Sequence, residues 1–271
     1  MKATATAHPI QGLIKYHGMH DEELRLPYHD SISICTAPSH TITTVEFQPD
    51  AAEDVYVIGD ERVQGRGAER IDSVVDHVRD RAEVDHPVRL ESDAFSPLPS
   101  GMNDADCRSE RIETDLEDDL RVVAAHVPAY KETEAAHREA AESHMFRARL
   151  AHIHHQIDAA CDALSDADFD RAFELAEHDS LSLAATTMTG PAGWVYWQPD
   201  TIAVFNAVRE LRESEGIPAY FSTDTGASVY VNTTVDHVDT VENAVSAVGV
   251  DTDVWAVGGP AEIRPSGDAL F

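Results

Sequence analysis

The stretch Leu13-Ile14-Lys15-Tyr16-His17-Gly18 begins with two apolar residues, which are followed by a lysine, a tyrosine, a histidine and a glycine. A lysine at the end of an apolar strand can place its ammonium group where it holds a phosphate or a carboxylate. On its own, the pattern is more typical of a lysine whose stem is buried while its charge reaches solvent. A functional lysine is favoured by the next residues, an acidic stretch and then Leu26-Pro27-Tyr28-His29-Asp30-Ser31-Ile32-Ser33, because chance would rarely produce this series.

A second segment, Thr223-Asp224-Thr225-Gly226, lies late in the chain between two apolar runs at 219–222 and 227–232. Turn residues between two such runs predict a β-hairpin. From this spacing alone, Asp224 is interpreted as a turn residue whose side chain bonds its own backbone.

The remaining chain divides into a β-rich front and a rear half that mixes helices and strands. In front, short apolar runs predict strands at 13–16, 31–36, 41–47, 55–58 and 87–91, and one helix at 68–81. Behind, the apolar spacing predicts a strand at 120–127, helices over 146–164, 169–176, 202–211 and 235–248, and a strand at 254–257. Residues 95–104, with two prolines and a glycine, predict a loop. This order indicates an α+β fold.

The charge composition indicates adaptation to high salt. Fifty acidic residues against 20 basic ones give a formal net charge of −30, and the only lysines are Lys2, Lys15 and Lys131. Concentrated salt screens most of the self-repulsion of such a chain. The same charge argues against nucleic acid and anionic membranes as partners. Since no apolar run could cross a bilayer and no secretory signal is visible, we expect a cytoplasmic protein.

The cysteines and histidines indicate neither a disulfide framework nor a metal site. Cys35, Cys107 and Cys161 are odd in number and far apart. His152 and His155 could share a helix face, but no cysteine or carboxylate completes a ligand set.

Taken in order, the two quoted segments resemble the diphosphomevalonate decarboxylases of the GHMP kinase superfamily. That family has a run similar to alanine-proline-x-asparagine-isoleucine-alanine-x-isoleucine-lysine-tyrosine-tryptophan-glycine-lysine, then leucine-proline-x-asparagine-x-serine-x-serine. Its threonine-phenylalanine-aspartate-alanine-glycine segment is similar to the stretch around Asp224. The resemblance implies two GHMP-like domains, a β-rich one over 1–115 and a ferredoxin-like α+β one over 116–271.

The resemblance also implies an ATP- and Mg²⁺-dependent carboxy-lyase that acts on a phosphorylated mevalonate, and a homodimer. Asp224 would face the tertiary hydroxyl of the substrate, where a carboxylate can accept or orient its proton. Lys15 would hold the anionic substrate at the catalytic site. The implied substrate-binding residues are Tyr16, Gly18, Ser31 and, from a weaker match, Lys131 and Thr133.

Two departures from the family pattern bear on the substrate and the nucleotide. The second lysine of the family's first run is replaced by Met19, which favours a monophosphate over a diphosphate substrate. The family's glycine-rich phosphate loop, which binds phosphates through backbone N–H groups, has no counterpart between Leu90 and Leu120. Only Pro97-Leu98-Pro99-Ser100-Gly101-Met102 is found there, which indicates an internal deletion.

Three functions therefore remain open. The first is decarboxylation of mevalonate 5-phosphate, or of its 5-diphosphate, to isopentenyl phosphate or diphosphate. The second is a mevalonate kinase-type phosphotransferase of the same superfamily, and the third is a catalytically impaired homologue that acts as a binding subunit.

Overall fold

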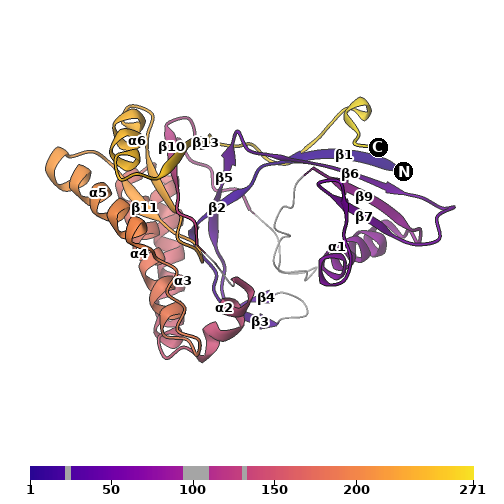
Figure 1. The fold of residues 1–271 in the computed structure, drawn as a ribbon, viewed down its shortest axis with the longest axis horizontal. Coiled ribbons are helices and arrows are strands. Elements are labelled where there is room, and N and C mark those ends of the chain that lie inside the picture. Colours follow the sequence, from indigo (N-terminus) through magenta and orange to yellow (C-terminus); the bar gives the residue numbers. More distant parts are fainter. Residues whose placement is uncertain (22–25, 94–109, 130–132) are drawn as a thin grey trace. The chain divides into compact units, whose positions relative to one another are not determined.

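The computed structural model describes residues 1–21, 26–93, 110–129 and 133–271, and the chain divides into two compact units (Figure 1). Unit 1 comprises Met1–Pro9, Cys35–Cys107 and Gly258–Phe271, and unit 2 comprises Ile10–Ile34 and Arg108–Val257. Both units therefore combine segments that are distant in sequence. The continuous domains 1–115 and 116–271 remain a prediction, and the loop expected at 95–104 lies outside the described residues.

In its described residues, unit 1 is a six-stranded sheet with one long helix, α1 (Arg66–Ala82). Its strands, in spatial order, are β14 (Glu262–Ile263), β1 (Lys2–Ala7), β6 (Thr41–Phe47), β9 (Val88–Ser92), β7 (Val55–Ile58) and β8 (Glu61–Arg62). Most neighbours are antiparallel, while β7 and β9 run parallel. The apolar face of α1 packs on the sheet through Ile71 and Val75, which form a core with Tyr56 and Val88.

Unit 2 contains a second six-stranded sheet, in the order β11 (Tyr220–Ser222), β12 (Val229–Thr234), β10 (Leu120–His126), β13 (Asp251–Val257), β5 (Ile32–Ala37) and β2 (Ile10–Ile14). The buried β10 pairs antiparallel with β12 on one side and with β13 on the other, so that Val123 lies opposite both Val231 and Val254. A small ribbon pairs β3 (Met19–Asp21) with β4 (Leu26–Pro27).

The α-helices in the described part of unit 2 are α2 (Thr133–Glu139), α3 (Phe146–Ser165), α4 (Phe169–Met188), α5 (Pro199–Glu215) and α6 (Val238–Ser246). The helices expected from apolar spacing are confirmed, and their ends follow local chemistry. The Asp168 side chain accepts a bond from the Arg171 backbone N–H at 3.1 Å and caps α4. Gly216, in the left-handed conformation, ends α5.

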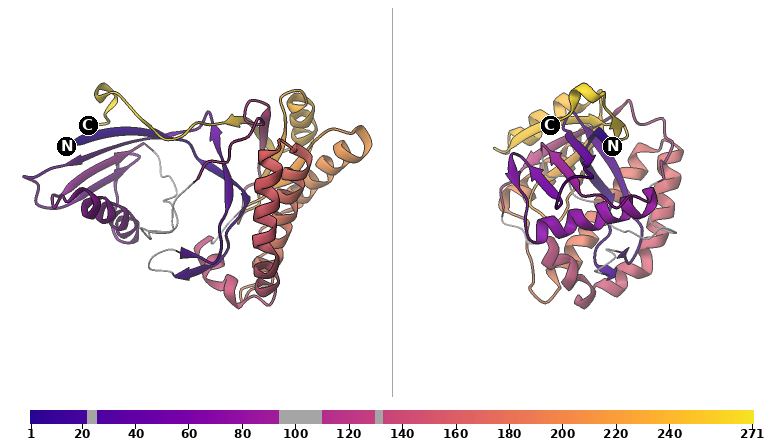
Figure 2. Two further views of the ribbon diagram at one scale, coloured as in Figure 1. Left: turned by 180° about the vertical axis from the view of Figure 1, so that it is seen from behind. Right: turned by 90° about the vertical axis from the view of Figure 1, so that its right-hand side faces the viewer.

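Helix α4 positions the site because it packs on the two edge strands of the sheet, β2 and β11, and on α3 (Figures 1 and 2). Ile14 of β2, Ile153 of α3 and Phe173 of α4 are all fully buried in one core. The ends of β2 and β11 are thus fixed against the same helix.

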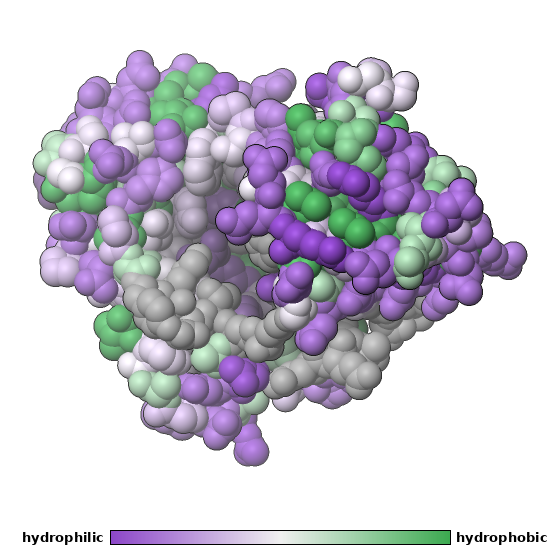
Figure 3. Space-filling view, turned by 45° about the vertical axis from the view of Figure 1, so that its right-hand side comes forward, coloured by the Kyte–Doolittle hydropathy of each residue, from purple (hydrophilic) through white to green (hydrophobic). Residues whose placement is uncertain are grey.

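Hydrophilic residues predominate on the face shown in Figure 3, as the acidic composition predicts. Within the described ranges, no helix is both long enough and apolar enough to cross a membrane. The α+β architecture expected from the sequence is confirmed.

Candidate functional site

Lys15 follows the last residue of β2 and is buried, with only 6% of its surface exposed. Its Nζ donates to the Leu13 carbonyl at 3.2 Å and to Ser180 Oγ on α4 at 3.1 Å. The alternative of a lysine that extends to solvent is therefore wrong for this residue. The ammonium group is held inside unit 2.

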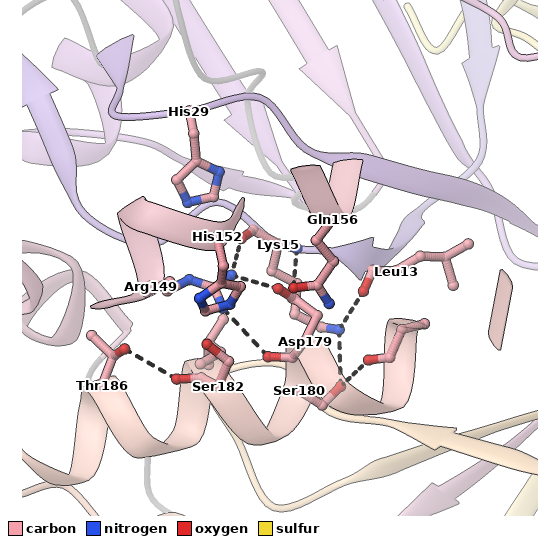
Figure 4. A network of polar contacts seen from close by, with 12 residues as sticks. Leu13, Lys15, His29, Arg149, His152, Gln156, Asp179, Ser180, Ser182 and Thr186 are labelled. Carbon is pink, nitrogen blue, oxygen red and sulfur yellow. Dashed lines mark hydrogen bonds and ion pairs between the residues drawn. The ribbon is translucent and has the colours of Figure 1, made fainter. Parts of the chain in front are cut away.

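The backbone of Lys15 is held by an ion pair between α3 and α4 (Figure 4). Its N–H donates to Asp179 Oδ2 at 2.9 Å, and its carbonyl accepts from Arg149 Nη2 at 2.6 Å. The same Nη2 lies 2.8 Å from Asp179 Oδ1, with side-chain exposures of 1% for Arg149 and 0% for Asp179. Because Lys15 lies beyond the strand, these two side chains replace the bonds of a sheet ladder.

Asp224 reaches the same region from the loop between β11 and β12. The predicted hairpin is confirmed, with Tyr220 opposite Asn232 and Ser222 opposite Tyr230. A Cβ placed on Gly12 of β2 would lie 2.8 Å from Lys15 Cγ and 3.5 Å from Asp224 Oδ1. The absence of a side chain at Gly12 thus leaves the space in which Lys15 and Asp224 approach each other.

The charges at this site act on one another. Burial lowers the pKa of Lys15, while Asp179 and then Asp224 oppose that shift and Arg149 adds to it. Burial, with a smaller contribution from Asp224, raises the pKa of Tyr230 to about 12. Lys15 and Asp224 are therefore electrostatically coupled within one unit.

Tyr16 and Gly18 lie beside α2. The half-buried Tyr16 ring stacks on His137, with 5.1 Å between ring centroids and 19° between planes. Gly18 has a φ of +86°, and its N–H donates to His137 Nδ1 at 3.4 Å. A side chain at Gly18 would also meet the Phe146 ring at 3.1 Å, so the position favours glycine.

Two buried histidines border the same segment. His17 Nε2 lies 3.3 Å from Thr187 Oγ1 of α4, and His29 Nδ1 lies 2.7 Å from the Asp30 carbonyl. Burial lowers the pKa of His17 to about 3 and lowers the pKa of His29. Both imidazoles are neutral at neutral pH.

The other predicted site residues are less tightly placed. Ser31 is exposed and immediately precedes β5. Lys131 lies outside the described residues, and Thr133 is the first residue of α2. The structure brings Lys15 and Asp224 together, and places Tyr16 and Gly18 in the segment that follows Lys15.

Three of the nine buried side-chain atoms without a hydrogen-bond partner in the described residues lie near the hairpin, and two others, Arg149 Nε and Asp179 Oδ1, lie beside Lys15. Among the described residues, Gln11 Oε1, Thr223 Oγ1 and Asn232 Oδ1 have no hydrogen-bond partner. Leaving such a group unsatisfied costs about 1–3 kcal/mol, so these atoms are typical of a place completed by a ligand or by water.

A small pocket, partly open to solvent, is bordered by the Asp224 loop. Its lining residues are Leu183, Ala184, Thr187, Met188, Trp194, Tyr196, Trp197, Asp224, Thr225 and Gly226. The Trp194 and Tyr196 rings stack almost parallel, 5.9 Å apart. In the part of the chain that is described, no group of three His, Cys, Asp or Glu side chains could hold a metal ion.

Sequence reasoning missed Arg149 and Asp179. A usable signal existed for Arg149, which stands between Phe146 and Ile153 at spacings of three and four, on the apolar face of α3. A buried arginine requires an acidic partner. The acidic partner of Arg149 is Asp179, in the middle of α4. The sequence alone does not show that α3 packs against α4, so this pair could not be predicted.

Comparison with solved structures defines the class of protein. Mevalonate diphosphate decarboxylase from Staphylococcus aureus superposes with a TM-score of 0.88 at 24% identity, over 97% of this chain and 98% of that chain. The protein called MDDEF, in complex with MVAPP, AMPPCP and magnesium, gives 0.85 at 20% over 98% and 99%. Mevalonate-3-kinase from Thermoplasma acidophilum gives 0.81 at 15% over 97% and 98%. These likenesses show the GHMP kinase-type α+β fold.

The sequence comparisons then identify the family. Residues 7–106 match the model of the diphosphomevalonate decarboxylase-like N-terminal domain. The phosphomevalonate decarboxylase of Haloferax volcanii is 65% identical over 324 aligned positions, which cover 100% of both proteins. The chain belongs to the mevalonate-phosphate decarboxylase family, a family of carboxy-lyases.

The lengths also bear on the nucleotide site. The alignment spans 324 positions and the chain has 271 residues, so at least 53 positions (324 minus 271) have no counterpart in this chain. The family resemblance puts the phosphate loop between Leu90 and Leu120, where Gly101 is the only glycine, and residues 94–109 of this stretch lie outside the described residues. This sequence does not fit a glycine-rich loop that surrounds the phosphates of ATP with backbone N–H groups.

Proposed function

We propose that the chain binds mevalonate 5-phosphate through unit 2 and decarboxylates it to isopentenyl phosphate. One observation carries the proposal: the Lys15 side chain and the Asp224 carboxylate both border the Cβ position of Gly12, in a chain 65% identical to a phosphomevalonate decarboxylase. The side chain of Asp224 accepts or orients the proton of the substrate's tertiary hydroxyl. Lys15 stabilises the negative charge of the substrate beside it.

The surroundings of the pair support this chemistry. An ammonium group in a site shielded from water acts more strongly on an anion than one in solvent. ATP and Mg²⁺ would supply the phosphoryl group that converts the tertiary hydroxyl into a leaving group, as the family resemblance implies.

The test is release of carbon dioxide and formation of isopentenyl phosphate from mevalonate 5-phosphate with ATP and Mg²⁺, in about 2 M KCl to screen the acidic chain. The variant Asp224→Asn is expected to lose at least about 100-fold in kcat, as the loss of a general base does. Asp236→Asn, which changes an aspartate beyond β12, is the matched control. Full activity in Asp224→Asn would remove Asp224 from this role, and product without carbon dioxide would indicate a phosphotransferase.

A second function is favoured because at least 53 positions of the alignment with the Haloferax volcanii protein have no counterpart in this chain. A chain that keeps Lys15 and Asp224 but lacks a phosphate loop would bind phosphorylated mevalonate without turnover, as a binding subunit. Calorimetric titration separates the two. Affinity for mevalonate 5-phosphate together with no measurable affinity for ATP would support the binding function, whereas micromolar ATP binding would exclude it. The homodimer and the cytoplasmic location expected from the sequence remain predictions.

A further inference from the structure

The Arg149–Asp179 ion pair surrounds Lys15 without forming a salt bridge to its ammonium group (Figure 4). Each carboxylate oxygen of Asp179 has its own contact, Oδ2 with the Lys15 backbone N–H and Oδ1 with Arg149. The Lys15 Nζ instead donates to the Leu13 carbonyl and to the Ser180 hydroxyl, and neither of these acceptors carries a charge. The carboxylate with the larger electrostatic effect on Lys15 is therefore bound to a different cation.

This arrangement is unusual for a buried lysine. An uncompensated charge in a protein interior is costly, so a buried ammonium group normally takes the closest carboxylate as its partner. Asp179 exerts a stronger charge effect on Lys15 than Asp224 does, and Ser180, beside Asp179, already contacts Lys15 Nζ. Without Arg149, Asp179 would be the preferred partner of Lys15.

We infer that Arg149 is a positioning residue that occupies Asp179 and so keeps the Lys15 ammonium group available to Asp224 and to an anionic substrate. The guanidinium group suits this task because one of its nitrogens reaches both Asp179 Oδ1 and the Lys15 carbonyl. Arg149 thereby fixes the Lys15 backbone while it neutralises the competing carboxylate. The expected effect of Arg149 on substrate affinity rests on the proposed function, whereas its expected effect on the pKa of Lys15 does not.

The charged and titratable groups around Lys15 come from each element packed on it. Arg149 belongs to α3, Asp179 to α4, and Asp224 to the β11–β12 loop. His29, which precedes β5, responds to the charges of Arg149 and Asp179. Because the imidazole of His29 is neutral at neutral pH, the balance on Lys15 is decided by one cation and two carboxylates.

The test measures the pKa of Lys15 directly by NMR titration of protein labelled with ¹³C at lysine Cε. The chain has only three lysines, so the signal of Lys15 is assigned by its loss in Lys15→Arg. In Arg149→Met, Asp179 is released and pairs with Lys15, so the pKa of Lys15 rises by about one unit or more. In the double variant Arg149→Met/Asp179→Asn, the competing carboxylate is absent, so this pKa returns to the wild-type value or below.

The matched control is Glu177→Gln, at a residue of α4, the helix that also carries Asp179. This variant breaks the ion pair between Glu177 and Arg212 of α5, whose charged atoms are 3.1 Å apart. Glu177 bonds the Phe221 N–H and does not touch Lys15, so its loss is expected to lower stability and leave the Lys15 titration unchanged. If Arg149→Met gives the same unshifted titration as Glu177→Gln, or the double variant stays as high as Arg149→Met, the inference fails.

A further measurement holds even if Arg149→Met does not fold. Asp224→Asn changes a loop residue, and the inference predicts that it lowers the pKa of Lys15, because Asp224 supports the charged form. An unchanged titration would contradict the inference. Affinity for mevalonate 5-phosphate, measured by calorimetry, should fall about tenfold in Arg149→Met and recover in the double variant. If the wild type binds no mevalonate 5-phosphate, the proposed function fails, while the titrations still decide the role of Arg149.

Discussion

Lys15 and His17 are ionisable side chains two positions apart, and burial lowers the pKa of both. Their surroundings nevertheless differ. Lys15 has two carboxylates that favour its charged form, whereas the groups acting on His17 are His137, Arg149 and His29, all of which disfavour it. The end of β2 is therefore followed by a cation and, two residues further on, by an imidazole that stays neutral.

This contrast predicts that acid destabilises the protein through His17. Its pKa is about 3 in the folded protein against 6.5 for an ordinary histidine, so between these values the unfolded chain binds a proton that the folded chain does not. The stabilising effect is complete above pH 6.5 and decreases as the pH falls through that window, by up to about 1.4 kcal/mol per pH unit. Urea unfolding at several pH values in high salt should give a shallower acid slope for His17→Gln.

The exposed His178 of α4 supplies the control for this measurement. His178→Gln should leave the acid slope of the free energy of unfolding unchanged. An equally steep slope in His17→Gln would show that His17 does not carry the effect and would direct attention to the other buried histidine, His29.

Met19 carries the prediction on substrate choice. The family pattern has a lysine at this position, and Met19 here is a half-buried residue of β3. An added ammonium group favours the ligand with more negative charge, so Met19→Lys is expected to improve affinity for mevalonate 5-diphosphate about tenfold over the 5-phosphate. Calorimetry with both ligands measures the ratio. Val195→Lys, at an exposed position, is the control for added charge, and an equal ratio in the two variants would refute the idea.

At the scale of elements, the packing of α3 against α4 and the sheet holds the Lys15 end of β2 in place. Ile153 of α3 is fully buried in this core, while Ile202 of α5 is 42% exposed. Truncation of a buried isoleucine leaves a cavity, so Ile153→Ala should lower the free energy of unfolding by about 2–5 kcal/mol. Ile202→Ala should cost less than about 1 kcal/mol. If denaturant unfolding gives the same loss of free energy for Ile153→Ala and Ile202→Ala, the core around Ile153 does not stabilise the protein more than an exposed helix position does.

Most elements could be predicted because their patterns are local. The strands at 41–47 and 55–58, the long helix α3 and the first part of α4, over 169–176, follow directly from apolar periodicity. The strand β1 could not, because its pattern is reversed. Thr4 is buried and bonds Thr44 at 2.9 Å across the sheet, while the neighbouring alanines Ala3 and Ala5 face outward. A strand whose buried positions are threonines and whose more exposed positions are alanines does not show the alternation of apolar and polar residues by which strands are predicted.

Only part of the candidate site could be predicted from the sequence, for a related reason. Lys15 and Asp224 were found through two motifs, each contained in a short segment. The contacts that organise them join residues separated by 134 and 164 positions, Arg149 and Asp179 with Lys15. Nothing local in α4 marks Asp179 as the partner of a strand end, since a carboxylate in a helix is ordinarily a solvated one.

At the scale of the whole molecule, the interleaving of the two units escaped sequence reasoning. The C-terminal Gly258–Phe271 belongs to the same unit as Met1–Pro9, and β14 pairs with β1 through Ala5 opposite Ile263. Composition shifts along a chain indicate continuous segments, and they contain no information on a return of the last residues to the first strand.

The net charge of −30 gives the last prediction, which concerns the stability of the entire chain. Repulsion among acidic groups opposes the compact state, and salt reduces it because the screening length falls from about 10 Å at 0.1 M to about 3 Å at 1 M. The thermal midpoint should therefore rise by at least about 10 °C between 0.1 M and 2 M KCl. Differential scanning fluorimetry measures it, with sucrose as a control because sucrose stabilises by exclusion and without screening. If sucrose at equal osmolality reproduces the whole gain, repulsion among the acidic residues does not limit the stability of this protein.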